Sequence, residues 1–310
     1  MKNTDLISIH DLEIDEILEI LNLAEIMKAN PDRYTDALAG KTLAMIFEKP
    51  SLRTRVTFEV GMTQMGGHAI YLASSDAQIG KRESIPDVAR NLERWTDAIM
   101  ARTFSHQTIV DLAAYAGIPV INGLSDLFHP CQALADFFTI RDIKGDLKGL
   151  KVVFVGDGNN VAHSLMHCAA KVGANITIVT PPGYEPREEV AREAREDAKK
   201  TGVEIHVTND IREGLKKADV VYTDVWASMG QEAEREERIR KFRDYQVNST
   251  VMDMASKSAI FMHCLPAHRG EEVTDDVADA QYSVIFQQAE NRLHVQKAIM
   301  NLLMGEESFI

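Results

Sequence analysis

The chain carries a group of hydroxyl and guanidinium side chains in the segment Ser51-Leu52-Arg53-Thr54-Arg55. The apolar residues 42–47 before it predict a strand, and Pro50 with Ser51 predicts a turn that opens a helix. A helix N-terminus offers backbone N–H groups and the positive end of its dipole, to which these side chains add further donors. The segment therefore fits a phosphate, although a capping serine followed by surface arginines would look the same.

A second polar group stands at the start of another predicted helix, in His129-Pro130-Cys131-Gln132. The imidazole of His129 can donate to a developing oxyanion, and the side chain of Gln132 can bond another amide with both its donor and its acceptor. The same residues would also fit a plain helix start, with proline in the first turn and a half-buried histidine. Taken alone, the motif leaves both interpretations open.

A carboxylate follows a predicted strand in the second half of the chain. Asp224 comes directly after the apolar residues 220–223. Because the carboxyl ends of parallel strands face the binding crevice, Asp224 is placed to meet a cationic group, unless it is an ordinary capping residue. Ser228 and the backbone amides near Met229 would suit a carboxylate. Together these residues fit a ligand that carries both an ammonium and a carboxylate.

Cysteine and histidine occur together at another strand end, in the stretch from His263 to Gly270. Cys264 could be read as a nucleophile, but nothing nearby requires a covalent route. A zinc site is the other interpretation, either in this stretch or at His163 and His167, one helical turn apart. Such sparse ligand sets usually bind no metal, so we expect none.

A glycine-containing turn after residues 151–155 resembles part of a dinucleotide-binding loop. Gly156 and Gly158 lack the third glycine at the required offset, and a lone Gly-x-Gly is weak evidence. Asn160, at the start of the next helix, is the side chain there that could contact a ligand. A nicotinamide-dependent oxidoreductase would fit the alternating pattern of this half. The incomplete glycine pattern and the arginine-containing turn in the first half weigh against it.

Apolar runs alternate with helical stretches along most of the chain, which is the pattern of parallel sheets covered by helices. A polar, glycine-punctuated joint at 144–149 separates two such series. We therefore expect an α/β protein with two domains, residues 1–145 and 146–288, each a parallel β-sheet flanked by helices. The C-terminal helix, 289–310, is expected to pack back on the first domain. The run 231–243 reads as a solvated helix. The predicted strands are 42–47, 69–73, 98–101, 119–121, 151–155, 176–180, 203–207, 220–223, 260–262 and 283–286.

The composition describes a globular chain without a nucleic-acid or membrane partner. The 310 residues are 45% hydrophobic, enough for an ample core. A net charge of −13 repels polyanions, so basic residues in a cleft would serve a small anion. No apolar run is long enough to span a bilayer, and the start lacks the pattern of a secretory signal. Three scattered cysteines argue against a disulfide framework, so we expect a cytoplasmic protein.

Taken together and in this order, these segments resemble the aspartate/ornithine carbamoyltransferase family. The motifs at 51–55 and 129–132 resemble the carbamoyl phosphate signatures that its branches share. The ornithine branch is indicated by Asp224 with Ser228-Met229-Gly230, and by His263-Cys264-Leu265-Pro266. The resemblance continues through 269–273 and 288–294, so it covers nearly the whole chain.

The resemblance implies transfer of a carbamoyl group from carbamoyl phosphate to the side-chain amine of ornithine, without a cofactor, as part of arginine metabolism. It also implies a homotrimer, or several trimers assembled further. An enzyme for putrescine or acetylornithine would use the same phosphate motifs, but Asp224 with Ser228 and Met229 favours plain ornithine. An aspartate-specific enzyme would need a cationic pocket where Asp224 stands. A catalytically silent binding subunit is disfavoured because every proposed ligand is present.

By the same resemblance, the residues divide into two substrate sets. Arg102 and His129 would hold the carbonyl oxygen, and Cys264 would lie beside the reacting amine, so these three are the expected catalytic residues. Leu52 departs from the threonine often found there, but its side chain is not a proposed ligand. Gln78 can reach into a neighbouring subunit in these proteins. The set for carbamoyl phosphate is Ser51, Leu52, Arg53, Thr54, Gln78, Arg102, His129, Pro130, Cys131, Gln132, Cys264, Leu265 and Arg292, and the set for ornithine is Asn160, Asp224, Ser228 and Met229.

Overall fold

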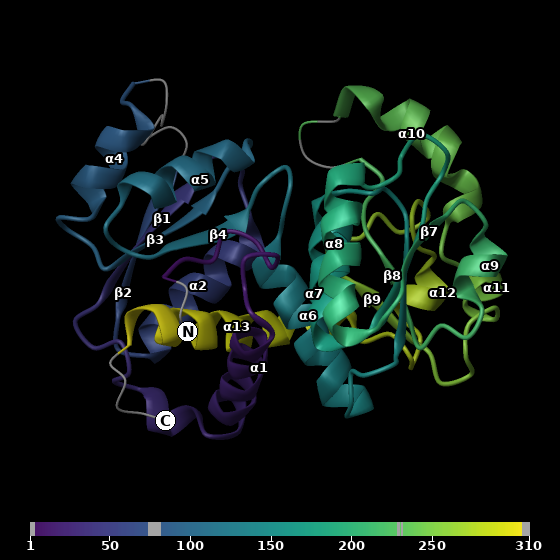
Figure 1. Cartoon of the computed structure of the whole chain (residues 1–310), viewed down its shortest axis with the longest axis horizontal. Coiled ribbons are helices and arrows are strands. Elements are labelled where there is room, and N and C mark those ends of the chain that lie inside the picture. Colours follow the sequence, from purple (N-terminus) through teal and green to yellow (C-terminus); the bar gives the residue numbers. More distant parts are fainter. Residues whose placement is uncertain (1–3, 74–81, 228–229, 231, 306–310) are drawn as a thin grey trace. The chain divides into compact units, whose positions relative to one another are not determined.

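The computed structural model describes residues 4–73, 82–227, 230 and 232–305, and the chain forms two compact units (Figure 1). Unit 1 comprises Met1–Phe138 with Asn291–Ile310, and unit 2 comprises Thr139–Glu290. The chain therefore passes between the units inside two helices, α6 (Pro130–Lys144) and α13 (Ile285–Met304). The glycine-punctuated joint expected at 144–149 begins at the last residue of α6.

Unit 1 is built on a four-stranded parallel sheet with the strand order β2-β1-β3-β4. The middle strands are buried along almost their whole length, which explains why they read as continuous apolar runs rather than alternating ones. The strands are β1 (Thr42–Phe47), β2 (His68–Ala73), β3 (Ala98–Arg102) and β4 (Val120–Leu124), and the helices are α1 (Ile14–Ala29), α2 (Leu52–Gln64), α4 (Ile85–Leu92) and α5 (His106–Tyr115), with the 3-10 turn η1 (Pro31–Tyr34).

Unit 2 is built on a five-stranded parallel sheet with the order β7-β6-β5-β8-β9. The strand order reverses between β5 and β8, and the loops after these two strands therefore lie where α/β proteins bind ligands. The strands are β5 (Lys151–Val155), β6 (Asn175–Val179), β7 (Ile205–Thr208), β8 (Val220–Thr223) and β9 (Ile260–His263). The helices are α7 (Asn160–Val172), α8 (Glu188–Thr201), α9 (Ile211–Leu215), α10 (Arg235–Phe242), α11 (Ser249–Met252) and α12 (Asp275–Ala278), with the 3-10 turns η2 (Glu232–Glu234) and η3 (Arg243–Tyr245).

Both sheets confirm the predicted α/β class, but one predicted strand is wrong. Residues 283–286 were expected to form a strand, whereas only Ser283 makes an isolated bridge, to Phe261, and α13 begins at Ile285. A short apolar run does not distinguish a buried strand from the first turn of a buried helix. Within the described residues, no helix has the length and hydrophobicity needed to cross a membrane.

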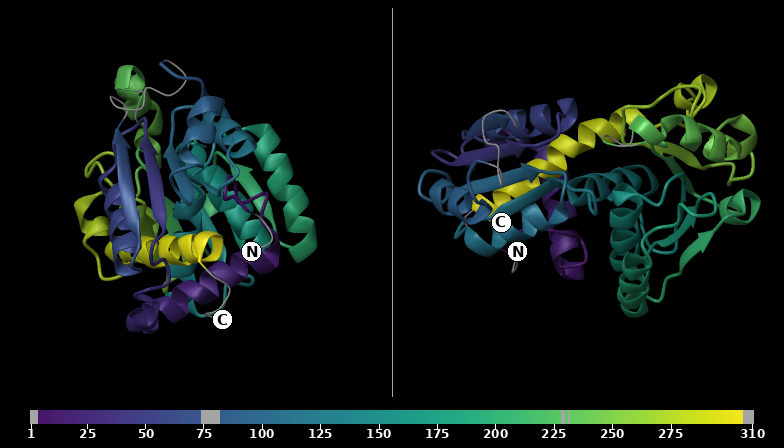
Figure 2. Two further views of the ribbon diagram at one scale, coloured as in Figure 1. Left: turned by 90° about the vertical axis from the view of Figure 1, so that its left-hand side faces the viewer. Right: turned by 90° about the horizontal axis from the view of Figure 1, so that it is seen from above.

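The C-terminal part of α13 packs on unit 1, as predicted (Figure 2). Lys28 at the end of α1 donates to the side-chain oxygen of Asn291 at 2.9 Å, and the ammonium of Lys297 donates to Gln64 of α2 at 3.2 Å. The approach to α2 is close: a Cβ added at Gly61 would lie 2.7 Å from Cε of Met300. Glycine at this position therefore leaves room for the end of the Met300 side chain.

We expect Gly61→Val to destabilise the protein by about 1–3 kcal/mol, because a branched side chain overpacks the contact with α13. Denaturant unfolding followed by circular dichroism would measure the change. Thr63→Val is the matched control, since it adds valine to an exposed position of the same helix and should change the free energy of unfolding by less than about 0.5 kcal/mol. Equal stability of the two variants would contradict the close approach.

Candidate functional site

The predicted phosphate turn is a capped helix N-terminus. Ser51 is the N-cap of α2, and its Oγ accepts a hydrogen bond from the backbone N–H of Thr54 at 3.2 Å. Thr54 is fully buried, and its own Oγ1 accepts from Nη2 of Arg292 at 2.8 Å. Leu52 is 74% exposed. The serine therefore caps the helix, as the simpler interpretation held, while Arg292 of α13 joins the same turn.

Arg102 reaches this turn through strand pairing. It is the last residue of β3 and lies opposite Phe47, the last residue of β1, in the parallel register. Its carbonyl oxygen accepts a hydrogen bond from the N–H of Glu48 at 2.8 Å. The side chain is only 6% exposed. The sheet thus brings a buried guanidinium to the carboxyl end of the strands, beside the segment that contains Ser51.

His129 lies in the electrostatic field of this arginine cluster. It precedes α6 and is 5% exposed. Burial lowers the pKa of the imidazole well below its ordinary value of 6.5. The positive charges of nearby guanidinium groups lower this pKa further, and these groups belong to Arg292, Arg102 and Arg53. His129 is therefore neutral at physiological pH, and a neutral imidazole can still donate one hydrogen bond to an oxyanion.

The two residues that follow Pro130 in α6 have different environments. Cys131 is fully buried, its Sγ donates to the carbonyl oxygen of Asn122 at 3.5 Å, and burial raises the pKa of the thiol to about 12. This cysteine is therefore not a nucleophile. Gln132 is 1% exposed, and its Nε2 donates to Oδ1 of Asp136 at 2.8 Å. One N–H of the amide is thus bonded within the protein.

The candidate ornithine residues in unit 2 centre on Asp224. Its carboxylate is 6% exposed and accepts two hydrogen bonds, from Nδ2 of Asn159 at 2.8 Å and from Sγ of Cys264 at 3.0 Å. Asn159 is also the N-cap of α7, since its Oδ1 accepts from the backbone N–H groups of the first turn. The sequence pointed to Asn160 as a ligand residue, and the structure adds its neighbour Asn159 as a partner of Asp224. The N-cap pattern before α7 was the signal that could have identified it.

The loop after β9 is organised by a buried histidine and carboxylate. Nδ1 of His263 accepts from the N–H of Leu265 at 2.8 Å, so the ring proton is on Nε2, which lies 3.1 Å from Oε1 of Glu272. Both side chains are fully buried. Leu265 has a φ of 57°, a left-handed conformation that is unusual for this residue type. The pair therefore holds the Cys264 loop in a conformation that the sequence alone would not favour.

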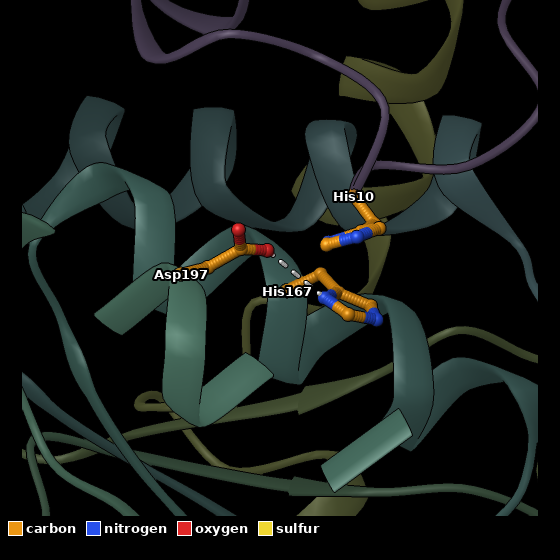
Figure 3. A group of neighbouring side chains, drawn as sticks. All are labelled: His10, His167 and Asp197. Carbon is orange, nitrogen blue, oxygen red and sulfur yellow. Dashed lines mark hydrogen bonds and ion pairs between the residues drawn. The ribbon is translucent and has the colours of Figure 1, made fainter. Parts of the chain in front are cut away.

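The histidines of the two zinc interpretations have hydrogen-bond partners within the protein. Ligand atoms of Asp224, His263 and Cys264 lie within 4.8 Å of one another, but both ring nitrogens of His263 already make hydrogen bonds. In α7, Nδ1 of His167 lies 3.3 Å from Asp197 of α8 (Figure 3). Nε2 of His163 instead accepts from the backbone N–H of Arg187. The two histidines therefore have separate structural partners.

Sequence reasoning missed the role of Arg238. In α10 it is only 6% exposed, and its Nη1 donates to Asp157 at 2.8 Å and to the carbonyl oxygen of Trp226 at 2.9 Å. It therefore ties the loop after β5 to the loop after β8, next to Asp224. Phe242, one turn later, is fully buried as well, so this helix has a buried face rather than being fully solvated. The i,i+4 spacing of these two residues was the available signal.

Three of the predicted ligands, Gln78, Ser228 and Met229, lie outside the described residues. Pro130 begins α6 as predicted. The remaining predicted residues form two groups, one in each unit. In unit 1 the group consists of Ser51, Arg53, Thr54, Arg102, His129, Gln132 and Arg292, and in unit 2 it consists of Asp224, Cys264 and Leu265, with Asn160 at the start of α7.

Comparisons with known proteins identify two family domains along the chain. The family model "aspartate/ornithine carbamoyltransferase, carbamoyl-P binding domain" matches residues 4–142, and its "Asp/Orn binding domain" matches residues 148–303. The chain is 56% identical over 307 residues to an ornithine carbamoyltransferase of Anoxybacillus flavithermus, covering 98% of each chain. It is 55% identical over 310 residues to the anabolic ornithine carbamoyltransferase of Pyrococcus furiosus, again covering 98% of each.

A solved structure is equally similar. The ornithine carbamoyltransferase from Pyrococcus furiosus superimposes with a TM-score of 0.94 at 55% identity, covering 97% of this chain and 96% of the other. Fold, motifs and overall sequence thus agree over nearly the full length. The chain belongs to the aspartate/ornithine carbamoyltransferase family.

Proposed function

We propose that this protein catalyses the ornithine carbamoyltransferase reaction, in which carbamoyl phosphate and L-ornithine give L-citrulline and phosphate. The observation that carries the proposal is a cluster of three guanidinium groups beside a buried, neutral His129. They belong to Arg53, Arg102 and Arg292, and their positive charges add to burial in lowering the pKa of the imidazole. Such a cluster suits a doubly charged phosphate attached to a carbonyl group. The names of the relatives, which are ornithine carbamoyltransferases at 50–56% identity, support the same reaction.

The proposed roles on the phosphate side follow from the capped turn. The first turn of α2, with Ser51, Arg53 and Thr54, binds the phosphate, because it combines the helix dipole with charged and hydroxyl donors. Arg102 bridges the phosphate and the carbonyl oxygen, and the family resemblance adds Gln78 as a further phosphate ligand. The buried guanidinium groups also stabilise the negative charge on phosphate as it leaves.

His129 and Arg102 are proposed to stabilise the oxyanion of the tetrahedral intermediate. The amine attacks the carbamoyl carbon directly, the carbonyl oxygen takes up negative charge, and the bond to phosphate then breaks. A single well-aimed oxyanion donor contributes roughly 3 kcal/mol to catalysis, and orienting two bound substrates contributes several more. No cofactor is needed for any of these steps.

On the ornithine side, Asp224 is proposed to bind the α-ammonium group, with Asn160 as a neighbouring ligand. Ser228 and Met229 are proposed, from the resemblance, to hold the α-carboxylate. The attacking amine has an unperturbed pKa near that of lysine, about 10.4, so it must lose a proton before it attacks. Phosphate, Cys264 and Asp224 are the candidate proton acceptors, and the 3.0 Å hydrogen bond between the last two couples them.

We also propose a cytoplasmic, biosynthetic enzyme that works as a homotrimer or as several trimers. The named anabolic relative supports the biosynthetic role. In unit 1, the edge strand β2 and the helix α2 expose apolar side chains, namely Ile70 (40%), Val56 (45%) and Leu52 (74%). Exposed apolar surface beside an unpaired strand edge supports a subunit contact there.

The direct test of the proposed function is citrulline formation by the purified protein from carbamoyl phosphate and ornithine. Putrescine, acetylornithine and aspartate serve as competing acceptors. We expect turnover with ornithine alone, because Asp224 offers an anion for the α-ammonium while Ser228 and Met229 offer donors for the α-carboxylate. Reaction with another acceptor would leave the phosphate side intact but refute the role given to Asp224. Absence of product with every acceptor would refute the enzymatic function.

Replacing Arg102 by alanine should lower kcat/KM by about 10²- to 10³-fold or more, since it removes an oxyanion donor and a phosphate ligand together. Arg94→Ala is the control, because this arginine is 76% exposed and pairs only loosely with Glu93 at 3.5 Å. Steady-state kinetics would be compared at equal folded fractions, measured by circular dichroism. Near-normal turnover by the Arg102→Ala variant would exclude the proposed role.

The lowered pKa of His129 predicts how stability depends on pH. Below pH 6.5, the ordinary value, the histidine in the unfolded chain takes up a proton while the buried imidazole stays neutral. The unfolded state then binds more protons, so stability falls as pH decreases from 6.5 toward the lower folded-state pKa. His129→Asn should flatten this part of the profile, as measured by urea unfolding across the range. The exposed His68→Asn is the control, and an identical slope in all three proteins would contradict the buried neutral state.

A further inference from the structure

Gln132 and Asp136 form a buried pair one helical turn apart on α6. The two side chains are 1% and 0% exposed, and Nε2 of Gln132 lies 2.8 Å from Oδ1 of Asp136. A glutamine amide can be turned either way, but a carboxylate only accepts hydrogen bonds. The atom that faces Asp136 must therefore be the nitrogen. The carboxylate determines the orientation of the amide.

This orientation turns the other end of the amide away from Asp136. Oε1 of Gln132 is buried, and among the described residues it has no hydrogen-bond partner. A buried acceptor without a donor is costly, and in a ligand site the cost is removed when a bound ligand supplies the donor. His129 is three residues earlier, at the entry to the same helix, and it lies within the arginine cluster. Oε1 is thus an acceptor reserved for a ligand that brings an N–H group.

We propose that Asp136 is a positioning residue that makes the site selective for a nitrogen-ended acyl phosphate over an oxygen-ended one. The inference rests on the proposed function, in which Gln132 contacts the carbamoyl amide. Asp136 does not touch the substrate. By binding Nε2, it keeps Oε1 as the end of the Gln132 amide that faces the substrate, so a carbamoyl NH₂ gains a hydrogen bond and a carboxylate oxygen meets another oxygen.

Two unreactive phosphonates isolate this effect. Phosphonoacetamide ends in NH₂, as carbamoyl phosphate does, and phosphonoacetate ends in a carboxylate oxygen. Their dissociation constants, measured by isothermal titration calorimetry, do not require turnover. We expect the unmodified protein to bind the amide about 10- to 100-fold more tightly than the acid, which corresponds to one buried hydrogen bond gained or lost.

Asp136→Asn should remove most of this preference. An asparagine can accept or donate, so the Gln132 amide is free to turn and to present Nε2 to the acid. Phosphonoacetate should then bind about tenfold or more tightly, while phosphonoacetamide changes by less than about threefold. Binding of inorganic phosphate, which has no acyl end, corrects for the loss of one negative charge. The ratio of the two phosphonate constants is the readout that general damage to the site would not change.

The reciprocal double variant tests the same idea with the net charge kept. In Gln132→Glu with Asp136→Asn, the asparagine donates to the new carboxylate, whose second oxygen again faces the substrate as an acceptor. Selection of the amide should therefore return. This variant also retains a buried hydrogen bond, so it serves if the single variant does not fold.

The chain contains a matched control for the pair. On α5, Nε2 of Gln107 donates to Oδ1 of Asp111 at the same 2.8 Å and the same spacing, but on the exposed surface. Asp111→Asn should leave the ratio unchanged. The proposal is overturned if the unmodified protein does not prefer the amide, if Asp136→Asn keeps the preference, or if the double variant lacks it. Citrulline formation is scored separately, so a failure of the proposed reaction is distinguished from a failure of this inference.

Discussion

Parallel strand pairing determines where the candidate functional residues of each unit can lie. In unit 2, Thr223 of β8 is paired with His263 of β9, so the next residues along the two strands, Asp224 and Cys264, become neighbours. Their 3.0 Å hydrogen bond is a direct result of that register. In unit 1, the pairing of Phe47 with Arg102 has the same effect. Because parallel strands end at one edge, residues far apart in sequence meet there without any special loop design.

A second constraint on the structure is that several positive charges lie close together in the interior of unit 1. Bringing buried guanidinium groups close to one another is unfavourable unless hydrogen bonds and an anion compensate. The 2.8 Å hydrogen bond from Arg292 to Thr54 is part of this compensation. Burial, and after it the same field, explain the neutral state of His129, since protonation would add a further positive charge in the interior. A site of this kind is prepared for an anionic substrate before the substrate arrives.

Around these groups, buried carboxylates act on neighbouring side chains rather than on a ligand. Glu272 sets the proton position of His263 and so the loop that carries Cys264. Asp157 takes part in an ion pair with Arg238 that ties two loops together, and burial raises its pKa. These acidic residues contribute to the large negative charge of the chain, which composition alone attributes to solubility. Several of them instead orient donors and acceptors inside the protein.

The sequence by itself determined the α/β class, the turn at Ser51 that opens a helix, the helix start at Pro130 and the position of Asp224 at a strand end, because each depends on local patterns of turns, caps and strand ends. It also indicated the family, through motifs spread along the chain. Only the tertiary structure decided that Asn159 contacts Asp224, that Arg238 is buried, and that residues 283–286 open a helix. It also decided which end of the Gln132 amide bonds Asp136 and which end has no partner among the described residues. Those features depend on partners distant in sequence or on the direction of a side chain, and local spacing contains no information about either.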